Sequence, residues 1–190
     1  MAPAASSTPD RGPPPSPADD GAAKHLLPGT RLPDVALTAT RGASVNLARY
    51  QERAVVFIYP MTGTPGVANP PDWDVIPGAH GSTPEAEGFR DACSEFEILG
   101  YEIFGVSGQR SEDQHAFAAR AGIPYLLLSD ARLQFADALK LPRFETGGVP
   151  YLKRLTMIVR DGVIYRTVYP VQAPGAHARE LLKSLKPTHV

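Results

Sequence analysis

The segment YPMTGTPGVANPPDWDVIPGAHGSTPEAEGFRD, residues 59–91, joins a strand pattern to a helix pattern. Upstream, residues 54–60 read AVVFIYP, a short continuous apolar run that is typical of a strand buried on both faces. Downstream, apolar side chains recur at helical spacing, at Phe89, Cys93, Phe96 and Leu99. Glycines and prolines between the two patterns interrupt regular structure. We therefore predict a long loop that ends at a helix N-terminus.

Ser82 and Thr83 lie where this helix is expected to begin. The first N–H groups of a helix have no partner within it and the helix dipole favours negative charge, so this position suits a polar or anionic ligand. A structural interpretation is also open. Residues 82–85, Ser-Thr-Pro-Glu, have the form of a capping box with proline in the first turn. Capping does not exclude a function.

The same segment resembles the peroxiredoxin family, above all its Q-type (bacterioferritin-comigratory) branch. That family has a strand ending in Tyr-Pro, a Pro-x-x-x-Thr-x-x-Cys loop and a helix containing Gly-Phe-Arg-Asp. Pro60 and Thr64 match the first part, and strict spacing puts the cysteine position at Val67. A second alignment fits better. Residues 81–91 are similar to the family's Gly-Cys-Thr-Thr-Glu-Ala-Cys-Gly-Phe-Arg-Asp, with an inserted loop before them.

Some bacterial redoxin-domain proteins have such a loop, with Trp-Asp and Ile-Pro-Gly-Ala in it, resembling residues 73–74 and 76–79 here. The resemblance implies a ligand site at the junction of loop and helix. Its expected ligand-binding residues come from the strand end, the loop and the helix: Pro60, Trp73, His80, Thr83 and Glu87.

The peroxidatic cysteine of the family is missing under either alignment. In the better one Ser82 takes its place, and Glu87 stands where many Q-type members have the resolving cysteine. Peroxiredoxins attack a peroxide oxygen with a thiolate, whereas a serine hydroxyl is not ionised without an adjacent base and forms no sulfenic acid. The resemblance thus implies a thiol-peroxidase scaffold, served by thioredoxin- or glutathione-type reductants if a cysteine form exists. The chain as written is expected to be inactive as a peroxidase.

Residues 154–159 resemble the family's Arg-Ser-Thr-Phe-Leu-Ile, whose arginine enters the active site beside the cysteine. The resemblance therefore assigns Arg154 to the site, where a planar, permanently charged donor suits a peroxide or an anion. On position alone, Arg154 is an ordinary charge at the start of a strand. We take Ser82, Thr64 and Arg154 as the expected catalytic positions. They predict a pocket for a small polar or peroxide-like ligand, with no cofactor and no metal.

The single cysteine, Cys93, excludes an intramolecular disulfide framework and a Cys-rich metal site. Its position on the face of Phe96 predicts a small buried core residue rather than a reactive thiol. A Ser82–His80–Asp74 triad can also be written down. His80 is so near Ser82 in sequence that their side chains need not meet, and no oxyanion element is identifiable.

The length of 190 residues suits one domain with a tail. Residues 1–24 are rich in Pro, Ala, Ser and Asp without apolar periodicity, which predicts a disordered, dispensable tail before a single domain at 25–190. No secretory signal and no transmembrane run is visible, so a cytoplasmic location is the default expectation. The net charge of −1 gives no case for nucleic acid or membrane as a partner, and a homodimer is left open.

The remaining patterns predict a thioredoxin-like α/β domain, with a central mixed sheet flanked by helices. Strands are expected at residues 35–40, 44–47, 54–60, 101–107, 124–128, 155–159 and 163–169. Helices are expected at residues 84–99, 111–122 with a second capping box at its start, from Asp130 to Pro142, and 174–185. The Asp161-Gly162 turn is the strongest hairpin signal in the chain.

Three functions agree with these features. The chain descends from a thiol peroxidase or is an engineered cysteine-less form of one; it is a natural relative recruited for non-redox catalysis on a small polar metabolite; or it is a pseudoenzyme that binds a ligand or a protein. Glu87 is chemically unlike the usual replacements for cysteine, which favours natural divergence over engineering.

Overall fold

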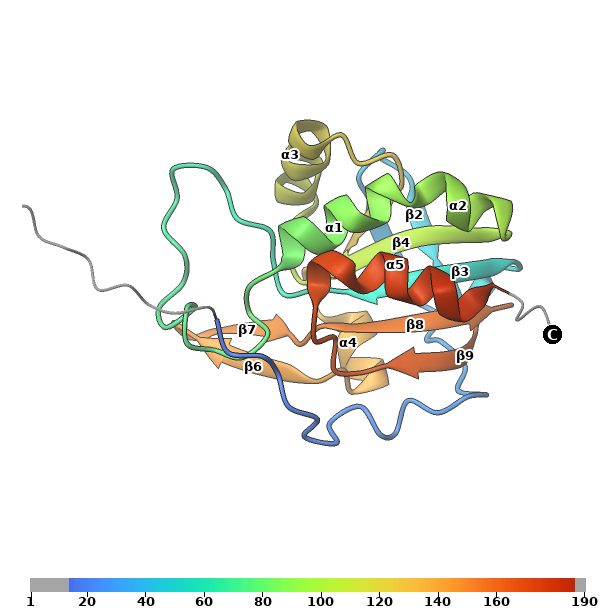
Figure 1. The fold of residues 1–190 in the computed structure, drawn as a ribbon, viewed down its shortest axis with the longest axis horizontal. Coiled ribbons are helices and arrows are strands. Elements are labelled where there is room, and N and C mark those ends of the chain that lie inside the picture. The colour runs from blue at the N-terminus through green and yellow to red at the C-terminus, as the bar shows by residue number, and fades with distance from the viewer. Residues whose placement is uncertain (1–13, 187–190) are drawn as a thin grey trace, which may run out of the picture.

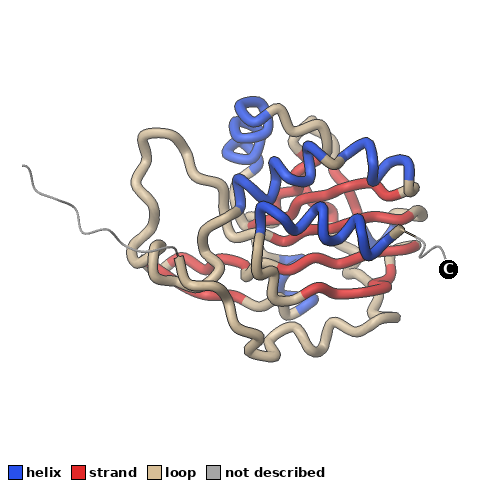
Figure 2. Tube along the Cα trace, in the orientation of Figure 1, coloured by secondary structure: helices blue, strands red, loops and turns tan. Residues whose placement is uncertain are grey.

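In the computed structural model, residues 14–186 of the chain are described. Their centre is a mixed sheet of seven strands in the order β2-β1-β5-β4-β3-β8-β9 (Figure 1, Figure 2). The middle strands run parallel: β3 (Arg53–Ile58), β4 (Tyr101–Ser107) and β5 (Leu126–Ser129). Antiparallel hairpins flank them: β1 (Ala36–Ala39) with β2 (Ser44–Asn46), and β8 (Leu155–Arg160) with β9 (Val163–Val168). The predicted α/β fold with a mixed central sheet is confirmed.

Helices cover both faces of this sheet. One face carries α1 (Ser82–Asp91), α2 (Cys93–Ile98), α3 (Ser111–Ala121) and α5 (Pro174–Leu185). The other face carries the 3-10 helix η1 (Leu47–Arg49) and α4 (Gln134–Leu139). Helices α1 and α5 lie side by side (Figure 1). No helix within residues 14–186 has the length and apolar content needed to cross a membrane.

Strand β3 is buried on both faces, as its continuous apolar run predicts. Val55 and Phe57 pack into the layer of α1, α3 and α5, whereas Val56 and Ile58 pack into the layer of α4. The ring of Phe57 stacks on that of Phe89 in α1, with 4.7 Å between their centroids. Strand β3 therefore joins the two layers, and its end delivers the chain to the inserted loop, residues 61–81.

Both predicted capping boxes are wrong. Gly81 is the N-cap of α1, with φ of 106°, so Ser82 is already the first helical residue, and no side chain caps this end. Ser111 is likewise the first residue of α3 and caps nothing. The Nε2 of Gln114 instead donates to the Oη of Tyr59 at 3.1 Å inside the core. Ser82, Glu85 and Gln114 instead bind partners far away in the sequence.

The helix predicted over residues 84–99 is two helices. The backbone leaves the helical region at Ala92, where φ is −104° and ψ is 0°, and α2 begins at the next residue. The predicted stop at Gly100, with φ of 76°, is confirmed. The helix predicted from Asp130 to Pro142 is shorter, because α4 covers only Gln134–Leu139 and its N-cap is Leu133. Asp130 is therefore not the N-cap, but its carboxylate accepts hydrogen bonds from the N–H groups of Phe135 and Ala136 in the first turn, at 3.2 and 2.8 Å.

Neither the 3-10 helix η1 nor a second small sheet was predicted. The sheet is formed by β6 (Arg143–Thr146) and β7 (Val149–Leu152). The inserted loop reaches this hairpin beyond the end of the main sheet (Figure 1). Trp73 packs there, with ring centroids 5.6 Å from Phe144 and 5.0 Å from Tyr151. Since β7 ends two residues before Arg154, the hairpin anchors the loop directly beside the candidate site.

The expected tail falls partly outside the described residues, which begin at residue 14. Residues 14–24 run along the domain beside β9 and the β6–β7 hairpin (Figure 1). Asp20 accepts hydrogen bonds from Lys153 Nζ at 2.6 Å and Tyr169 Oη at 2.7 Å, and Gln172 Nε2 donates to the carbonyl of Pro17 at 2.7 Å. These contacts differ from the expectation of an unpacked segment. They fix residues 17–20 across the surface of the domain, and this segment is called the strap below.

Gly105 in β4 provides a test of how tightly side chains pack on the sheet face covered by α1, α3 and α5. A Cβ at this position would lie 2.6 Å from the ring of Phe57 and 2.7 Å from Leu127. We expect Gly105→Ala to lower the free energy of unfolding in urea by about 1–3 kcal/mol, because overpacking displaces both side chains. The control is Gly63→Ala in the inserted loop, where no atom lies within 4 Å. Equal midpoints for the two variants would contradict this packing.

Candidate functional site

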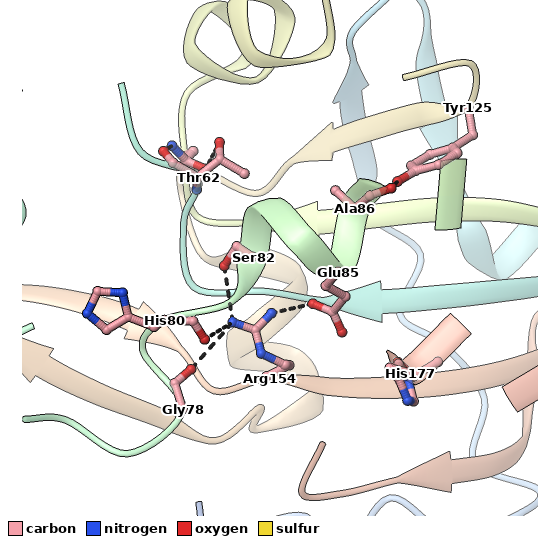
Figure 3. A network of polar contacts seen from close by, with 11 residues as sticks. Thr62, Gly78, His80, Ser82, Glu85, Ala86, Tyr125, Arg154 and His177 are labelled. Carbon is pink, nitrogen blue, oxygen red and sulfur yellow. Dashed lines mark hydrogen bonds and ion pairs between the residues drawn. The ribbon is translucent and has the colours of Figure 1, made fainter. Parts of the chain in front are cut away.

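The start of α1 and the start of β8 meet at the end of β3. Ile58 is paired with Leu155, so the antiparallel register puts Arg154 beside the point where β3 ends. Arg154 Nη2 donates a hydrogen bond to Ser82 Oγ at 3.2 Å (Figure 3). Each of the two residues is only 3% exposed. The structure thus brings together Ser82 and Arg154, two of the three positions expected to form the site.

Protein groups surround the guanidinium of Arg154. Its Nη1 forms a buried ion pair with Glu85 of α1, on the side away from the loop (Figure 3). Its Nη2 also donates to the carbonyls of His80 and Gly78, at 3.0 and 3.4 Å. The inserted loop therefore supplies, from its own backbone, the acceptors that an anion or peroxide at Ser82 would offer to Arg154.

Glu85 is fully buried, at 0% exposure. Burial raises the pKa of its carboxyl to about 7, because desolvation of the charged form outweighs the attraction of Arg154. Within the described residues, neither Glu85 Oε1 nor Arg154 Nε has a hydrogen-bond partner. The ion pair is thus strongly desolvated and incompletely hydrogen-bonded. Removing either partner would leave the other charge buried without compensation.

Other expected residues lie outside this cluster. Thr64 is exposed on the inserted loop, and it forms no hydrogen bond with Ser82 or Arg154 within residues 14–186. The buried threonine near the end of β3 is Thr62, whose N–H donates to Gln109 Oε1 at 2.8 Å. The loop insertion moves Thr64 outward, which the sequence alignment does not reveal.

Four of the expected ligand-binding residues divide by exposure: Pro60 and Trp73 are buried, whereas Thr83 and Glu87 are partly exposed. Pro60 is buried at the end of β3, and Thr83 and Glu87 are partly exposed on α1. Glu87 lies 3.8 Å from Arg90 in a surface ion pair. Trp73 is buried against the β6–β7 hairpin. Their role in binding remains a prediction.

The triad is not assembled. His80 Nε2 and Asp74 Oδ1 are 2.8 Å apart, so two members of the triad do pair. The ring of His80, however, points away from Ser82, and only its backbone carbonyl faces Arg154 (Figure 3). The hydroxyl of Ser82 is bonded to Arg154 rather than to an imidazole. Ser82 therefore lacks the adjacent base that would activate it.

Cys93 lies at the start of α2, at the far end of α1 from Ser82. It is partly buried and packs against the edge of the aromatic layer, so it is more exposed than the predicted buried core residue. Its Sγ donates to Glu97 Oε1 at 3.5 Å, and partial burial together with that carboxylate raises the thiol pKa to about 11. A thiol with a raised pKa is protonated at neutral pH and is a poor nucleophile.

The role of Glu85 was not predicted, because its spacing from Ser82 is that of a capping box. A signal was present, because the family frame aligned with residues 81–91 has glutamate at the same place. His177 of α5 was also missed. It is 4% exposed and shares a hydrogen bond of 2.8 Å with Thr156 Oγ1, on the strand that follows Arg154.

Comparison with known proteins agrees with this architecture. A sequence profile of the Redoxin family matches residues 27–182. The chain belongs to the redoxin family. Chloroplastic peroxiredoxin Q of Sedum lineare is 30% identical over 160 residues, which is 83% of this chain and 77% of the relative. That of Suaeda salsa is 31% identical over 83% of this chain and 67% of the relative. The resemblance to Q-type peroxiredoxins is confirmed.

Solved structures give the same result. The crystal structure of peroxidoxin BcpB from Mycobacterium tuberculosis has a TM-score of 0.68 and 26% identity, and the match covers 85% of this chain and 97% of that one. A cysteine-to-serine mutant of PrxQ from Xylella fastidiosa has a TM-score of 0.69 over 85% of this chain and 96% of that one. At 23% identity, the latter supports the fold alone. The predicted thioredoxin-like, peroxiredoxin-type fold is confirmed.

The buried ion pair can be tested by a double-mutant cycle. We expect Arg154→Met to lower the free energy of unfolding by about 3–5 kcal/mol, because it leaves the Glu85 carboxyl buried without a partner. Arg154→Met combined with Glu85→Leu is expected to recover part of that loss. Urea unfolding of the two single variants and the double variant measures the coupling. Strictly additive losses would show that the two residues act independently.

His177 provides a test of pH dependence. Burial, with Arg154 and Arg166 nearby, lowers its pKa from 6.5 to about 4. The unfolded chain then binds the proton more readily than the folded protein, so this stability is complete above pH 6.5 and is lost as the pH falls towards 4. Relative to His177→Gln, the protein should lose about 2–3 kcal/mol between neutral pH and pH ~4.5. Parallel urea-stability profiles for the two proteins would contradict this.

Proposed function

We propose that this protein uses a peroxiredoxin scaffold for a non-redox binding role and does not reduce hydroperoxides with a thiol. The observation that carries the proposal is the contact between Ser82 and Arg154. In the better alignment Ser82 holds the place of the peroxidatic cysteine, and its hydroxyl is bonded to the arginine that the resemblance assigns to the site. The electrostatic surroundings of a reactive thiol are retained while the sulfur is absent.

The remaining thiol supports the same proposal. Cys93 is separated from Arg154 by the length of α1, and its pKa is raised rather than lowered. A peroxidatic cysteine needs a high thiolate fraction, which basic neighbours and a helix N-terminus provide. Cys93 is paired with Glu97 instead. Neither position 82 nor Cys93 therefore supplies a thiolate for peroxide reduction. Without an oxidised catalytic cysteine, a thioredoxin- or glutathione-type reductant has no group to reduce.

Binding is favoured over recruitment as a non-redox enzyme. General acid–base catalysis requires a titrating group within reach of the ligand. Glu85 titrates in a suitable range but is fully buried and paired with Arg154. His80 is turned away from Ser82 and paired with Asp74 (Figure 3). The carbonyls of Gly78 and His80 also occupy the donors of Arg154 that face the loop.

The first test is peroxide consumption by the unmodified protein. We expect no reduction of hydrogen peroxide or an organic hydroperoxide above the rate without protein, with either a thioredoxin system or glutathione as the reductant. Cys93→Ser is the matched control and should give the same rate. Thiol-dependent reduction that disappears in Cys93→Ser would refute the proposal, because it would make Cys93 the nucleophile.

The second test restores the sulfur with Ser82→Cys in the Cys93→Ser background. The new thiol would lie at the N-terminus of α1 near Arg154, and both features lower a cysteine pKa. Thiolate absorbance as a function of pH should give a pKa below the ordinary value of about 8.5 for a free cysteine. A sulfenate-specific reagent with mass spectrometry should detect one sulfenic acid per chain after peroxide. An unshifted pKa would mean that the site no longer has the electrostatics of a peroxiredoxin.

A further inference from the structure

A cavity lies beside Arg154, and Ser82 does not line it. Its volume is about 300 Å³, and neither Ser82, Thr64 nor Pro60 is among the residues that line it. The strap, the inserted loop and the chain around the start of β8 and the end of β9 form its walls. We infer that this cavity binds a small organic monocarboxylate with a compact apolar body. The inference names a site for the binding role proposed above and rests on that role.

The walls of the cavity are mainly apolar. They come from segments that are far apart in the sequence: Pro17, Ile76, Pro77, Phe144 and Pro170. Prolines and a phenylalanine ring form rigid walls, because they have little side-chain freedom to lose when a ligand binds. Concave sites of this kind take the apolar part of a small molecule and use a few polar groups to orient it.

The charged groups of the cavity are two cations and one carboxylate, Lys153, Arg154 and Asp20. Asp20 already accepts hydrogen bonds from Lys153 and from Tyr169, which hold the pKa of its carboxyl well below the ordinary value. Glu85 pairs with Arg154 from the other side and does not line the cavity. Among the lining residues alone, the cations outnumber the carboxylates by one, because the carboxylate that balances Arg154 lies behind it. A ligand in the cavity therefore meets Lys153 and Arg154 before Glu85, which favours an anion.

Arg154 also lacks one hydrogen-bond acceptor. Its Nη1 and Nη2 are bonded to Glu85, Ser82 and the loop carbonyls, whereas its Nε has no partner within residues 14–186. Arg154 is a wall residue of the cavity, and its side chain is only 2% exposed. A guanidinium donor in a desolvated position pairs best with a carboxylate oxygen. Nε is itself buried, so a carboxylate bound in the cavity would supply that acceptor after a small shift of the Arg154 side chain.

The inference is tested with phenylacetate and its uncharged analogue phenylacetamide, titrated into the full chain by calorimetry. We expect phenylacetate to bind at least tenfold more tightly than the amide, because only the acid supplies the negative charge. Equal affinity for the two probes, or no binding of either at millimolar concentration, would overturn the inference.

Three variants separate charge from the closure of the strap, each first checked for an unchanged melting temperature. Lys153→Gln should weaken phenylacetate binding at least fivefold, whereas Asp20→Asn breaks the same ion pair but should leave binding unchanged or tighter. Equal weakening in both would mean that the strap, not charge, governs binding, and would overturn the inference.

Ile76→Trp should fill the cavity and abolish binding, and retained binding would place the ligand elsewhere. Lys183→Gln, at an exposed lysine of α5, is the control and should bind as the unmodified protein does.

The two proposals fail separately. A chain that reduces peroxide but prefers phenylacetate to the amide refutes the non-redox role and leaves the cavity site standing. A chain that is inert towards peroxide and shows no preference for the acid refutes the cavity site alone.

Discussion

The guanidinium of Arg154 is the group on which the architecture of the site depends. It joins three parts of the chain through hydrogen bonds and an ion pair: β8, from whose start it extends, the N-terminal turn of α1, and the inserted loop. A permanently charged group in a desolvated position has to find acceptors, and here nearly all of them come from the protein. Arg154 therefore holds the inserted loop on the site, although the family resemblance assigns this arginine to binding the peroxide.

This arrangement changes what the family likeness implies. A peroxiredoxin active site needs a thiolate and an arginine with donors free for the peroxide. In this chain the hydroxyl of Ser82 takes one donor interaction and the carbonyls of Gly78 and His80 take the others. The scaffold is retained, while the Arg154 donors that face the loop are taken by the protein itself. Family membership thus predicts the fold more safely than the reaction.

The fold could be predicted from local patterns. The apolar run of β3, the Asp161-Gly162 turn and the amphipathic pattern of α5 each specify an element over a few residues. The β6–β7 hairpin was missed although Gly147-Gly148 is a turn signal, because its strands have only four residues each. Site geometry was harder to predict. Ser82 and Glu85 have the spacing of a capping box, and only the tertiary fold shows that both are bonded to an arginine about 70 positions away.

The junction of the inserted loop with α1 also depends on the last helix of the fold. A Cβ at Gly81 would lie 2.6 Å from Pro174, the first residue of α5, and Gly88 faces the backbone of Gly175. During synthesis the N-terminal part of a chain emerges first, so α1 is made well before α5. The turn that positions Ser82 is consequently completed only after the start of α5, far downstream in the chain, has emerged and packed against Gly81. Until then, the start of α1 and the loop before it lack the surface against which they pack.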